Sequence, residues 1–455
     1  MIEFVTIFLL ILLLLAYFTL GRNFSRPSIL YIIGFLLCSV VAYNYRKEWG
    51  LHSMSSITAF VLVGGAFMFY AVEWYDYKRH PIQGRKIDIN SDEFQPISPI
   101  KLVIFLVFQL IVFSLLAKER MMYAMTSNLS DALVEYNNDV KFKEVSVRVP
   151  FYINHPYIMC VVSRYIWCVL FPYYLFKDKR YNIQKILIFL NLIVGSMGTT
   201  LMGGRTGILN DIVTLLSFTY ICYYFKTEFR GGLFPRKIMI LILAVGLAFS
   251  AFFNELGYAL GRKESEDPVS IILSIYCGAE IKNLDDFIQH PFKQGNESGL
   301  PAQYTLCGMY AKFAYYQGIK GSRLYSPDLR FNDYGNYPLG NVYTTYYNFI
   351  LDFGIWGAVL FTGVMALIAA FLYRKVINSC FWKNGRLDLW VIFYASLVPS
   401  ACFLSFFSCK FFESFSFTGV GRDMLYCWIV AYFLQGKFPF FVKKYELNYI
   451  ESDEY

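Results

Sequence analysis

Long apolar runs recur along the whole chain, and they constrain its fold more than any other feature. A bilayer core about 30 Å thick requires roughly 20 predominantly apolar residues for each helical span. The chain has 455 residues, of which 56% are hydrophobic and 16% charged, whereas a soluble domain carries about a quarter charged residues. A single water-soluble core does not account for that balance. We therefore expect an all-α, polytopic transmembrane helical bundle.

The apolar runs predict about eleven spans. They fall at residues 2–19, 27–45, 57–75, 100–117, 156–176, 184–202, 206–225, 238–255, 354–373, 388–407 and 422–436. The first run is preceded by no basic residue and followed by no small-residue cleavage site, so it is interpreted as a retained helix rather than a signal peptide.

Orientation follows from the lysines and arginines, which concentrate in alternate short loops and in the C-terminal tail. Loops rich in Lys and Arg stay in the cytoplasm, so we expect the N-terminus outside and the C-terminus inside. Both long loops, 118–155 and 256–353, then lie outside. The net charge of +8 is explained by this topology, and no nucleic-acid partner is expected.

The predicted organisation has six parts. They are N-terminal helices in 1–117, a first long external loop in 118–155, helices in 156–255, a large external loop in 256–353, C-terminal helices in 354–436 and a cytoplasmic tail in 437–455.

The large loop has helices of its own. Asp267 and Pro268 predict a helix start, and apolar residues follow at helical spacing until His290. A second helix is predicted from Pro301 to near Gly318. We expect both to be amphipathic, with the apolar side towards lipid or neighbouring spans. Two external cysteines in this loop, at positions 277 and 307, leave a disulfide open.

No metal or cofactor is expected. The four histidines are dispersed along the chain, so a zinc site or a His-based triad would need distant loops to converge. The sequence has no phosphate-binding glycine loop or nucleotide-binding fingerprint.

Two polar stretches are candidates for chemistry. The turn Gly203-Gly204-Arg205-Thr206-Gly207 joins two spans, at a helix start whose amides favour an anion such as phosphate. The alternative is that Arg205 extends to lipid headgroups as an anchor. The second stretch, residues 330–347, is dense in Asn, Tyr, Thr and Asp. Asn341 is predicted to cap a helix there, and these residue types are those that bind sugars.

The turn at 203–207, the later stretch Gly340-Asn341-Val342-Tyr343-Thr344 and the motif Asp352-Phe353-Gly354-Ile355-Trp356-Gly357 occur together in this order. In order, spacing and topology they resemble the O-antigen polymerases of the Wzy type, the oligosaccharide repeat unit polymerases. The likeness covers roughly residues 195–373.

The resemblance implies a GT-C class glycosyltransferase of the bacterial inner membrane, acting in the periplasm without metal or nucleotide. It would transfer a glycan from undecaprenyl diphosphate to another lipid-linked repeat unit, with membrane lipid as its surroundings and a chain-length regulator as a possible partner. Cations stabilise a departing diphosphate, and a carboxylate accepts the proton of the attacking hydroxyl. The residues assigned to diphosphate are Arg205, Arg330, Arg262, Arg323 and Arg422; those to proton acceptance, Asp333 and Asp352; those to the acceptor sugar, Asn341, Tyr343 and Thr344.

Three other functions stay open. A lipid-linked oligosaccharide flippase would line a central path with charged residues in most spans, and few intramembrane charges occur. A related ligase would depend on a periplasmic histidine, for which His290 is the loop candidate. A non-enzymatic envelope scaffold would tolerate loss of every loop arginine and carboxylate.

Overall fold

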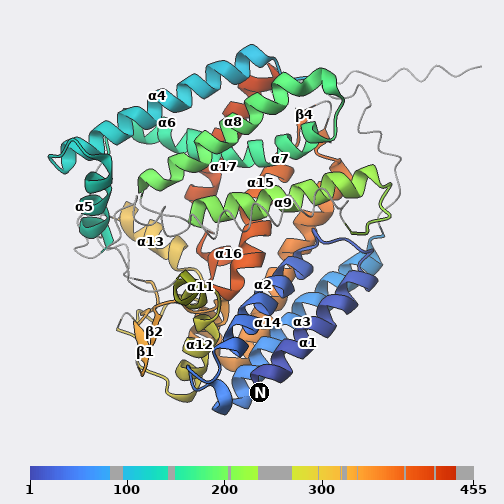
Figure 1. Cartoon of the computed structure of the whole chain (residues 1–455), viewed down its shortest axis with the longest axis vertical. Helices are drawn as coiled ribbons and strands as arrows, with labels where there is room; N and C mark the ends of the chain where they lie inside the picture. Colours follow the sequence, from blue (N-terminus) through green and yellow to red (C-terminus); the bar gives the residue numbers. More distant parts are fainter. Residues whose placement is uncertain are drawn as a thin grey trace, which may run out of the picture.

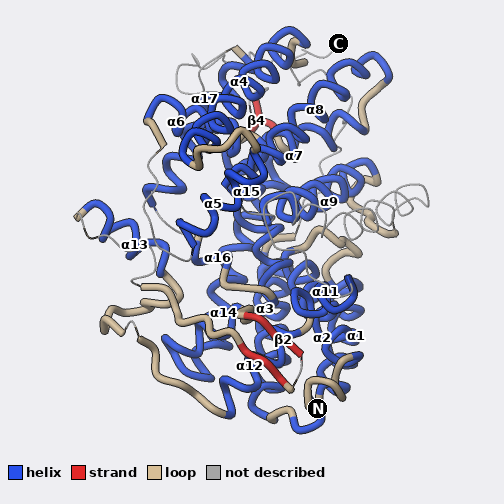
Figure 2. The backbone as a smooth tube through the Cα atoms, turned by 60° about the vertical axis from the view of Figure 1, so that its left-hand side comes forward, coloured by secondary structure: helices blue, strands red, loops and turns tan. Residues whose placement is uncertain are grey.

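The described part of the chain forms a bundle of helices with two very short hairpins (Figure 1). This computed structural model describes residues 1–81, 96–141, 149–202, 206–233, 269–295, 297–317, 319, 325–335, 337–383, 386–414 and 417–436. Within these ranges the helices dominate, as Figure 2 shows in blue. The predicted all-α class is confirmed in that respect.

Nine spans of the described residues are long and apolar enough to cross a membrane, which confirms a helical membrane protein. They are α1 (Ile2–Thr19), α2 (Pro27–Asn44), α3 (Ser56–Arg79), α4 (Pro99–Tyr123), the pair α6 (Phe151–Val162) and α7 (Arg164–Leu175), α8 (Asn182–Gly198) with the 3₁₀ turns η2 (Lys179–Tyr181) and η3 (Thr199–Met202), α9 (Thr206–Lys226), α14 (Thr345–Ser379) and α15 (Leu389–Phe403) with η4 (Leu404–Phe406).

The remaining elements are shorter or more polar. They are η1 (Leu51–Ser53), α5 (Leu129–Lys141), α11 (Val269–Cys277), α12 (Ala279–Gln289), α13 (Cys307–Tyr316), α16 (Lys410–Glu413), α17 (Phe417–Gln435) and the hairpins β1 (Asn332–Tyr334) with β2 (Tyr337–Gly340) and β3 (Trp382–Lys383) with β4 (Arg386–Leu387).

Each of the nine spans overlaps a predicted one. The predicted span at 422–436 lies within α17, whose first turns include Arg422 and Asp423, and α17 is not among the nine. The span predicted at 238–255 lies outside the described residues. The span count therefore stays a prediction.

Two groups of helices build the bundle. The first group consists of α1, α2, α3 and α14, and the second contains α4, α6, α7, α8, α9 and α17. Helix α15 packs against α2 and α14 on one side and against α7, α9 and α17 on the other. Figure 1 shows the first group at the lower right and the second above it. The outer face of α1 carries exposed apolar side chains, as contact with lipid requires.

The elements of the two long loops gather on one side of the bundle. Figure 1 shows α5, α13 and the β1–β2 hairpin on the left, and the β3–β4 hairpin on the right. This arrangement agrees with placing loops 118–155 and 256–353 on the same face. Which face lies outside the membrane stays a prediction from the basic loops.

Helix α14 contains a sharp break at Gly354, in the motif Asp352 to Gly357. Gly354 has φ 68° and ψ −174°, a conformation that is open essentially to glycine only. The nine residues before the break, Thr345 to Phe353, form a separate helical segment at the loop end of α14. This segment carries Asn348 and Asp352, which contact the large loop.

The large loop packs into the first helix group. The first predicted helix ends at His290 as expected, but it is broken at Gly278 into α11 and α12. Helix α12 is buried on most sides and contacts α2, α3 and β2. Asp285 accepts hydrogen bonds from Ser55 N (2.9 Å) and Thr58 Oγ1 (2.7 Å), which fixes α12 to the start of α3.

Two expectations for this loop need correction. The second helix begins at Cys307 rather than Pro301, since residues 301–306 form turns. The helix after β2 is capped by Thr344, whose Oγ1 accepts a hydrogen bond from Tyr346 N. Asn341 lies in a turn three residues earlier and does not cap it.

Cys277 and Cys307 are both free thiols, so no disulfide joins them.

Candidate functional site

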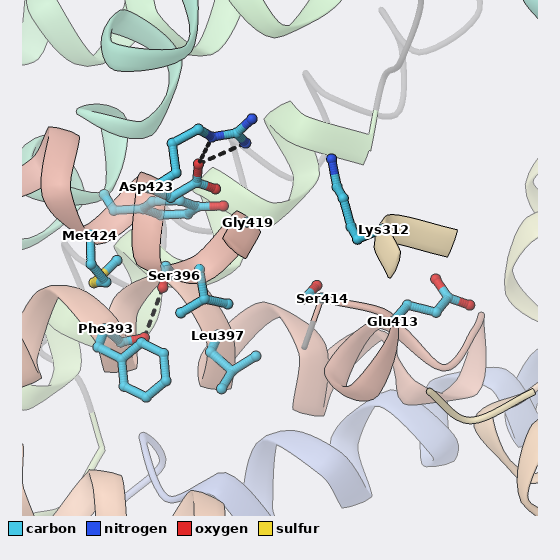
Figure 3. A pocket seen from close by; sticks show the side chains of 12 residues that line it. Lys312, Phe393, Ser396, Leu397, Glu413, Ser414, Gly419, Asp423 and Met424 are labelled. Carbon is cyan, nitrogen blue, oxygen red and sulfur yellow. Dashed lines mark hydrogen bonds and ion pairs between the residues drawn. The ribbon is translucent and has the colours of Figure 1, made fainter. Parts of the chain in front are cut away.

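A cavity of about 260 Å³ lies among α7, α13, α15, α16 and α17 (Figure 3). We call it the charged cavity. It is lined by Tyr165, Lys312, Phe393, Ser396, Leu397, Glu413, Ser414, Gly419, Val420, Arg422, Asp423 and Met424. Its charged groups come from three separate elements, because Lys312 is on α13, Glu413 on α16, and Arg422 and Asp423 on α17.

The charges of this cavity lie on two walls. Arg422 donates from Nε (3.0 Å) and Nη2 (2.9 Å) to the same oxygen, Oδ1 of Asp423. Figure 3 shows Lys312 and Glu413 on the opposite side from Asp423. Lys312 is exposed and makes no ion pair within 4.0 Å with any described residue. It is therefore the cation most available to an anionic ligand.

A buried ion pair supports one wall of the charged cavity. Arg164 Nε lies 2.9 Å from Asp211 Oδ1, and both side chains are less than a tenth exposed. The other oxygen of Asp211 accepts a hydrogen bond from Ser196 Oγ (2.7 Å). Arg164 Nη2 donates to Tyr165 Oη (2.8 Å), and Tyr165 lines the cavity. The pair thereby joins α7, α8 and α9 and fixes one aromatic wall.

A second cavity of about 390 Å³ lies beside the first. We call it the amide cavity. It is lined by Cys307, Gly308, Ala311, Ser326, Pro327, Leu329, Asn341, Val342, Tyr343, Asn348, Phe407, Ser408, Lys410 and Glu413. Asparagine amides and hydroxyls face it together with the rings of Tyr343 and Phe407, and the charged residues of its described lining are Lys410 and Glu413.

Glu413 lines both cavities. Its Oε2 accepts a hydrogen bond from Lys410 Nζ (3.0 Å), within the single turn of α16. Helix α13 passes directly over this turn, because a Cβ added at Gly308 would lie 2.2 Å from the carbonyl oxygen of Glu413. Such close approach of two backbones requires glycine. The wall between the cavities is thus made by α16 and α13.

The broken segment of α14 positions α13. Asp352 accepts hydrogen bonds from Tyr304 N on Oδ1 (3.1 Å) and from Thr305 N on Oδ2 (2.6 Å). Asn348 Nδ2 donates to Tyr304 O (2.8 Å). These three bonds hold the turn just before α13, and α13 carries Lys312 into the charged cavity.

A polar network supports the amide cavity from behind. Asn283 of α12 donates to Val342 O (2.8 Å), and Asn332 of β1 donates to Asn283 Oδ1 and to Tyr343 Oη (both 3.0 Å). Burial raises the pKa of Tyr343 to about 12. Its neutral hydroxyl accepts the hydrogen bond from Asn332 and donates one to Arg330 O (3.3 Å).

Of the five predicted arginines, one lines a cavity, one lies outside both cavities, and three are not among the described residues. Arg422 lines the charged cavity. Arg330 is exposed, lies over the ring of Phe292 (3.8 Å) and pairs with Asp328 (3.3 Å), outside the linings of both cavities. The other three, Arg205, Arg262 and Arg323, lie outside the described residues.

Of the other predicted residues, some line a cavity and some do not. Asn341 and Tyr343 line the amide cavity, whereas Thr344 is buried as the cap of α14. Asp333 is exposed on β1. Asp352 has both oxygens engaged by backbone N–H groups. Neither aspartate lines a cavity described above.

Sequence reasoning missed several lining residues, above all Lys312, Glu413, Asp423 and Asn348. One signal was available, since Arg422-Asp423 places two adjacent charges at the start of an apolar run. Lys410 and Glu413 flank two phenylalanines, a pattern that does not reveal which helices meet there.

The arrangement presents cations beside an aromatic wall and, across one carboxylate, a set of amides and hydroxyls. It is suited to an anionic head group next to a polyhydroxylated one. Among the described residues no cluster of three or more His, Cys, Asp and Glu side chains is suited to a metal ion. Comparisons with family models, curated proteins and solved structures find no match to this chain.

Proposed function

We propose that this protein polymerises undecaprenyl-diphosphate-linked oligosaccharide repeat units into O-antigen or a related surface polysaccharide. The observation that carries the proposal is that two chemically different cavities meet at Glu413, one charged and one lined by amides and hydroxyls. A glycan transfer between two lipid carriers needs such a pair of neighbouring sites. The resemblance in the motifs at 203–207, 340–344 and 352–357 points to the same reaction.

The charged cavity fits the donor. Arg422 offers a planar guanidinium for a diphosphate. Lys312 lies on the opposite side of the cavity from Asp423, the hydrogen-bond partner of Arg422 (Figure 3). Arg422 is paired with Asp423 through one carboxylate oxygen, so an incoming diphosphate would compete for the guanidinium. Cations at this position stabilise the charge that develops on the leaving diphosphate, and an acid to protonate it is not required.

The amide cavity fits the acceptor. Asn341, Asn348 and Tyr343 bring amides and a hydroxyl to its wall, and sugars present hydroxyls to bond and C–H faces to stack on rings. The cavity volume of about 390 Å³ lies in the usual range of ligand pockets. It accommodates the sugars at the end of an acceptor, with the rest of the glycan outside.

The cellular setting follows from the topology. The basic loops predict that both cavities open on the external face, which for this reaction is the periplasmic side of a bacterial inner membrane. A lipid-tethered donor and acceptor reach such a site from the bilayer. A polysaccharide chain-length regulator is the proposed protein partner.

Arg422→Ala tests the donor assignment. Cells that lack the chromosomal copy are complemented with wild type, Arg422→Ala or the control Arg230→Ala, whose side chain is 84% exposed. The expected result is normal protein level in all three and glycans of a single repeat in Arg422→Ala only. Removing one such electrostatic contact costs about 10²-fold or more in rate. Long-chain glycan at wild-type level in Arg422→Ala would refute the assignment.

The same cells separate the alternatives. Loss of a flippase leaves the lipid-linked repeat on the cytoplasmic face, so it would not be accessible to a periplasmic glycosidase. Loss of a ligase leaves long glycans on the carrier lipid. A scaffold tolerates Arg422→Ala without change in glycan length. A polymerase alone predicts single repeats that have reached the periplasm and are still transferred onward.

A further inference from the structure

Glu413 and Asp423 are the carboxylates among the described lining residues, and Asp333 and Asp352 are the carboxylates predicted to be the base. Asp352 uses both oxygens on backbone N–H groups. Asp423 holds Arg422 through Oδ1 and lines the charged cavity only. Asp333 is exposed on β1 and lines neither. Glu413 is the one carboxylate among the described lining residues that faces both cavities.

The position of Glu413 is fixed by two contacts. Lys410 Nζ donates to Oε2 at 3.0 Å. The backbone of Glu413 lies against Gly308 of α13, so that its main chain is held between two helices. The side chain remains 29% exposed, although its neighbours Phe411 and Phe412 are buried. A fixed carboxylate that remains accessible at the junction of two cavities is well placed for proton transfer.

We propose that Glu413 accepts the proton of the attacking acceptor hydroxyl, with Lys410 as its positioning residue. This inference rests on the function proposed above and identifies the group that takes up the proton of the acceptor hydroxyl. The hydroxyl oxygen in the amide cavity forms a bond to the anomeric carbon of the donor sugar. The bond from that carbon to the diphosphate oxygen breaks, and its electron pair leaves with the diphosphate. The hydroxyl proton passes to Glu413, which later releases it to water.

The placement explains why the carboxylate separates the cavities. A base for this reaction must lie beside the acceptor hydroxyl and close to the anomeric carbon, which is bound to the diphosphate in the neighbouring cavity. Lys410 orients the carboxylate through one oxygen, and the attacking hydroxyl approaches the other. Neither Asp333 nor Asp352 satisfies this requirement where the structure places them.

The test uses the full-length protein in lipid nanodiscs. The substrate is the lipid-linked single-repeat glycan isolated from cells that lack this protein, and chain growth is followed by mass spectrometry. Wild type, Glu413→Gln, Glu413→Asp and the control Asp178→Asn are compared; the Asp178 side chain is 62% exposed. For Glu413→Gln we expect kcat to fall about 10²- to 10⁴-fold, with KM and thermal unfolding unchanged. Glu413→Asp should recover part of kcat, and Asp178→Asn should equal wild type.

Three outcomes would overturn the inference in distinguishable ways. A kcat of Glu413→Gln within about twofold of wild type excludes a role for Glu413 in proton transfer. Equal losses in Glu413→Gln and Glu413→Asp, with a lower unfolding temperature in both, assign Glu413 a structural role. Failure of the wild type itself to extend the lipid-linked repeat refutes the proposed function, and with it this inference.

Discussion

The charged cavity and the amide cavity share the wall formed by α13 and α16, but they are built from different kinds of structure. Arg422, Asp423 and Tyr165 of the charged cavity project from long helices of the bundle. Much of the amide cavity is formed by connecting segments, including residues 326–329 and 341–343. Groups on packed helices are held more rigidly than groups on loops.

This difference suits the two tasks of the proposed reaction, which are binding of the donor diphosphate and recognition of the acceptor sugar. The diphosphate is common to every lipid-linked donor, so a rigid site built on packed helices serves all of them. Acceptor sugars differ between polysaccharides, and loop segments change with least effect on the fold. We therefore expect the charged cavity to depend on buried support and the amide cavity on local hydrogen bonds.

The largest expected effect is on stability, in Arg164→Ala. Removing this guanidinium leaves Asp211 buried without its cation, which costs about 3–5 kcal/mol. The matched control is Arg330→Ala, since Arg330 forms an exposed pair with Asp328 near the amide cavity and such pairs contribute about 0–1 kcal/mol. Thermal unfolding of the purified proteins measures both. Equal losses would show that the two cavities do not differ in their support.

The sequence predicted the membrane helices well, because a span in lipid requires a long apolar run whatever its neighbours are. It also predicted helices within the large loop. Asn341 and Tyr343 line the amide cavity because they belong to one short segment, whose sequence already brings them together.

The charged cavity was not predictable in the same way. Its walls combine residues 165, 312, 413 and 422, which come from four elements in three distant regions of the chain. Helices that pack within a membrane share a uniformly apolar pattern, so periodicity does not indicate which of them meet. The role of Asp352 could not be predicted for a related reason. Its carboxylate accepts hydrogen bonds from the backbone N–H groups of Tyr304 and Thr305, and a backbone group leaves no signature in the sequence.

The second prediction concerns the element that both cavities share. Asp352→Ala removes two hydrogen bonds to the turn before α13, at a cost of about 2–4 kcal/mol to the docking of that turn. Since α13 lines both cavities, we expect kcat to fall and KM for the acceptor to rise together. Limited proteolysis should detect faster cleavage between α12 and α13. A change in only one kinetic constant would mean that the cavities are positioned independently.

A smaller effect, confined to the amide cavity, is expected for Tyr343→Phe. The variant keeps the ring and removes the hydroxyl that accepts a hydrogen bond from Asn332. Loss of one hydrogen bond between this hydroxyl and the acceptor sugar corresponds to about 1 kcal/mol, so KM for the acceptor should rise about fivefold. Binding of undecaprenyl diphosphate, measured by its protection against thermal unfolding, should be unchanged. A comparable loss of diphosphate binding would contradict the assignment of donor and acceptor to separate cavities.

The smallest predicted effect uses Cys307 as a reporter on the shared wall. Burial raises the pKa of this thiol to about 12, and the negative charge of Glu413 contributes to the rise. Glu413→Gln removes that charge, so the pKa of Cys307 falls and its thiolate fraction at pH 8 increases. Alkylation of Cys307 by iodoacetamide should then be faster by a few-fold, up to about tenfold for each unit of pKa.

Cys277 provides the control within the same molecule. Burial raises the pKa of its thiol to about 12 as well, but the neighbouring carboxylate there is Glu280. Its alkylation rate should therefore be the same in wild type and Glu413→Gln, when both sites are followed by peptide mass spectrometry. A selective change at Cys307 would show that the charge of Glu413 acts inside the amide cavity. Equal rates at Cys307 in the two proteins would mean that this carboxylate faces the charged cavity alone, and the shared wall would no longer connect donor and acceptor.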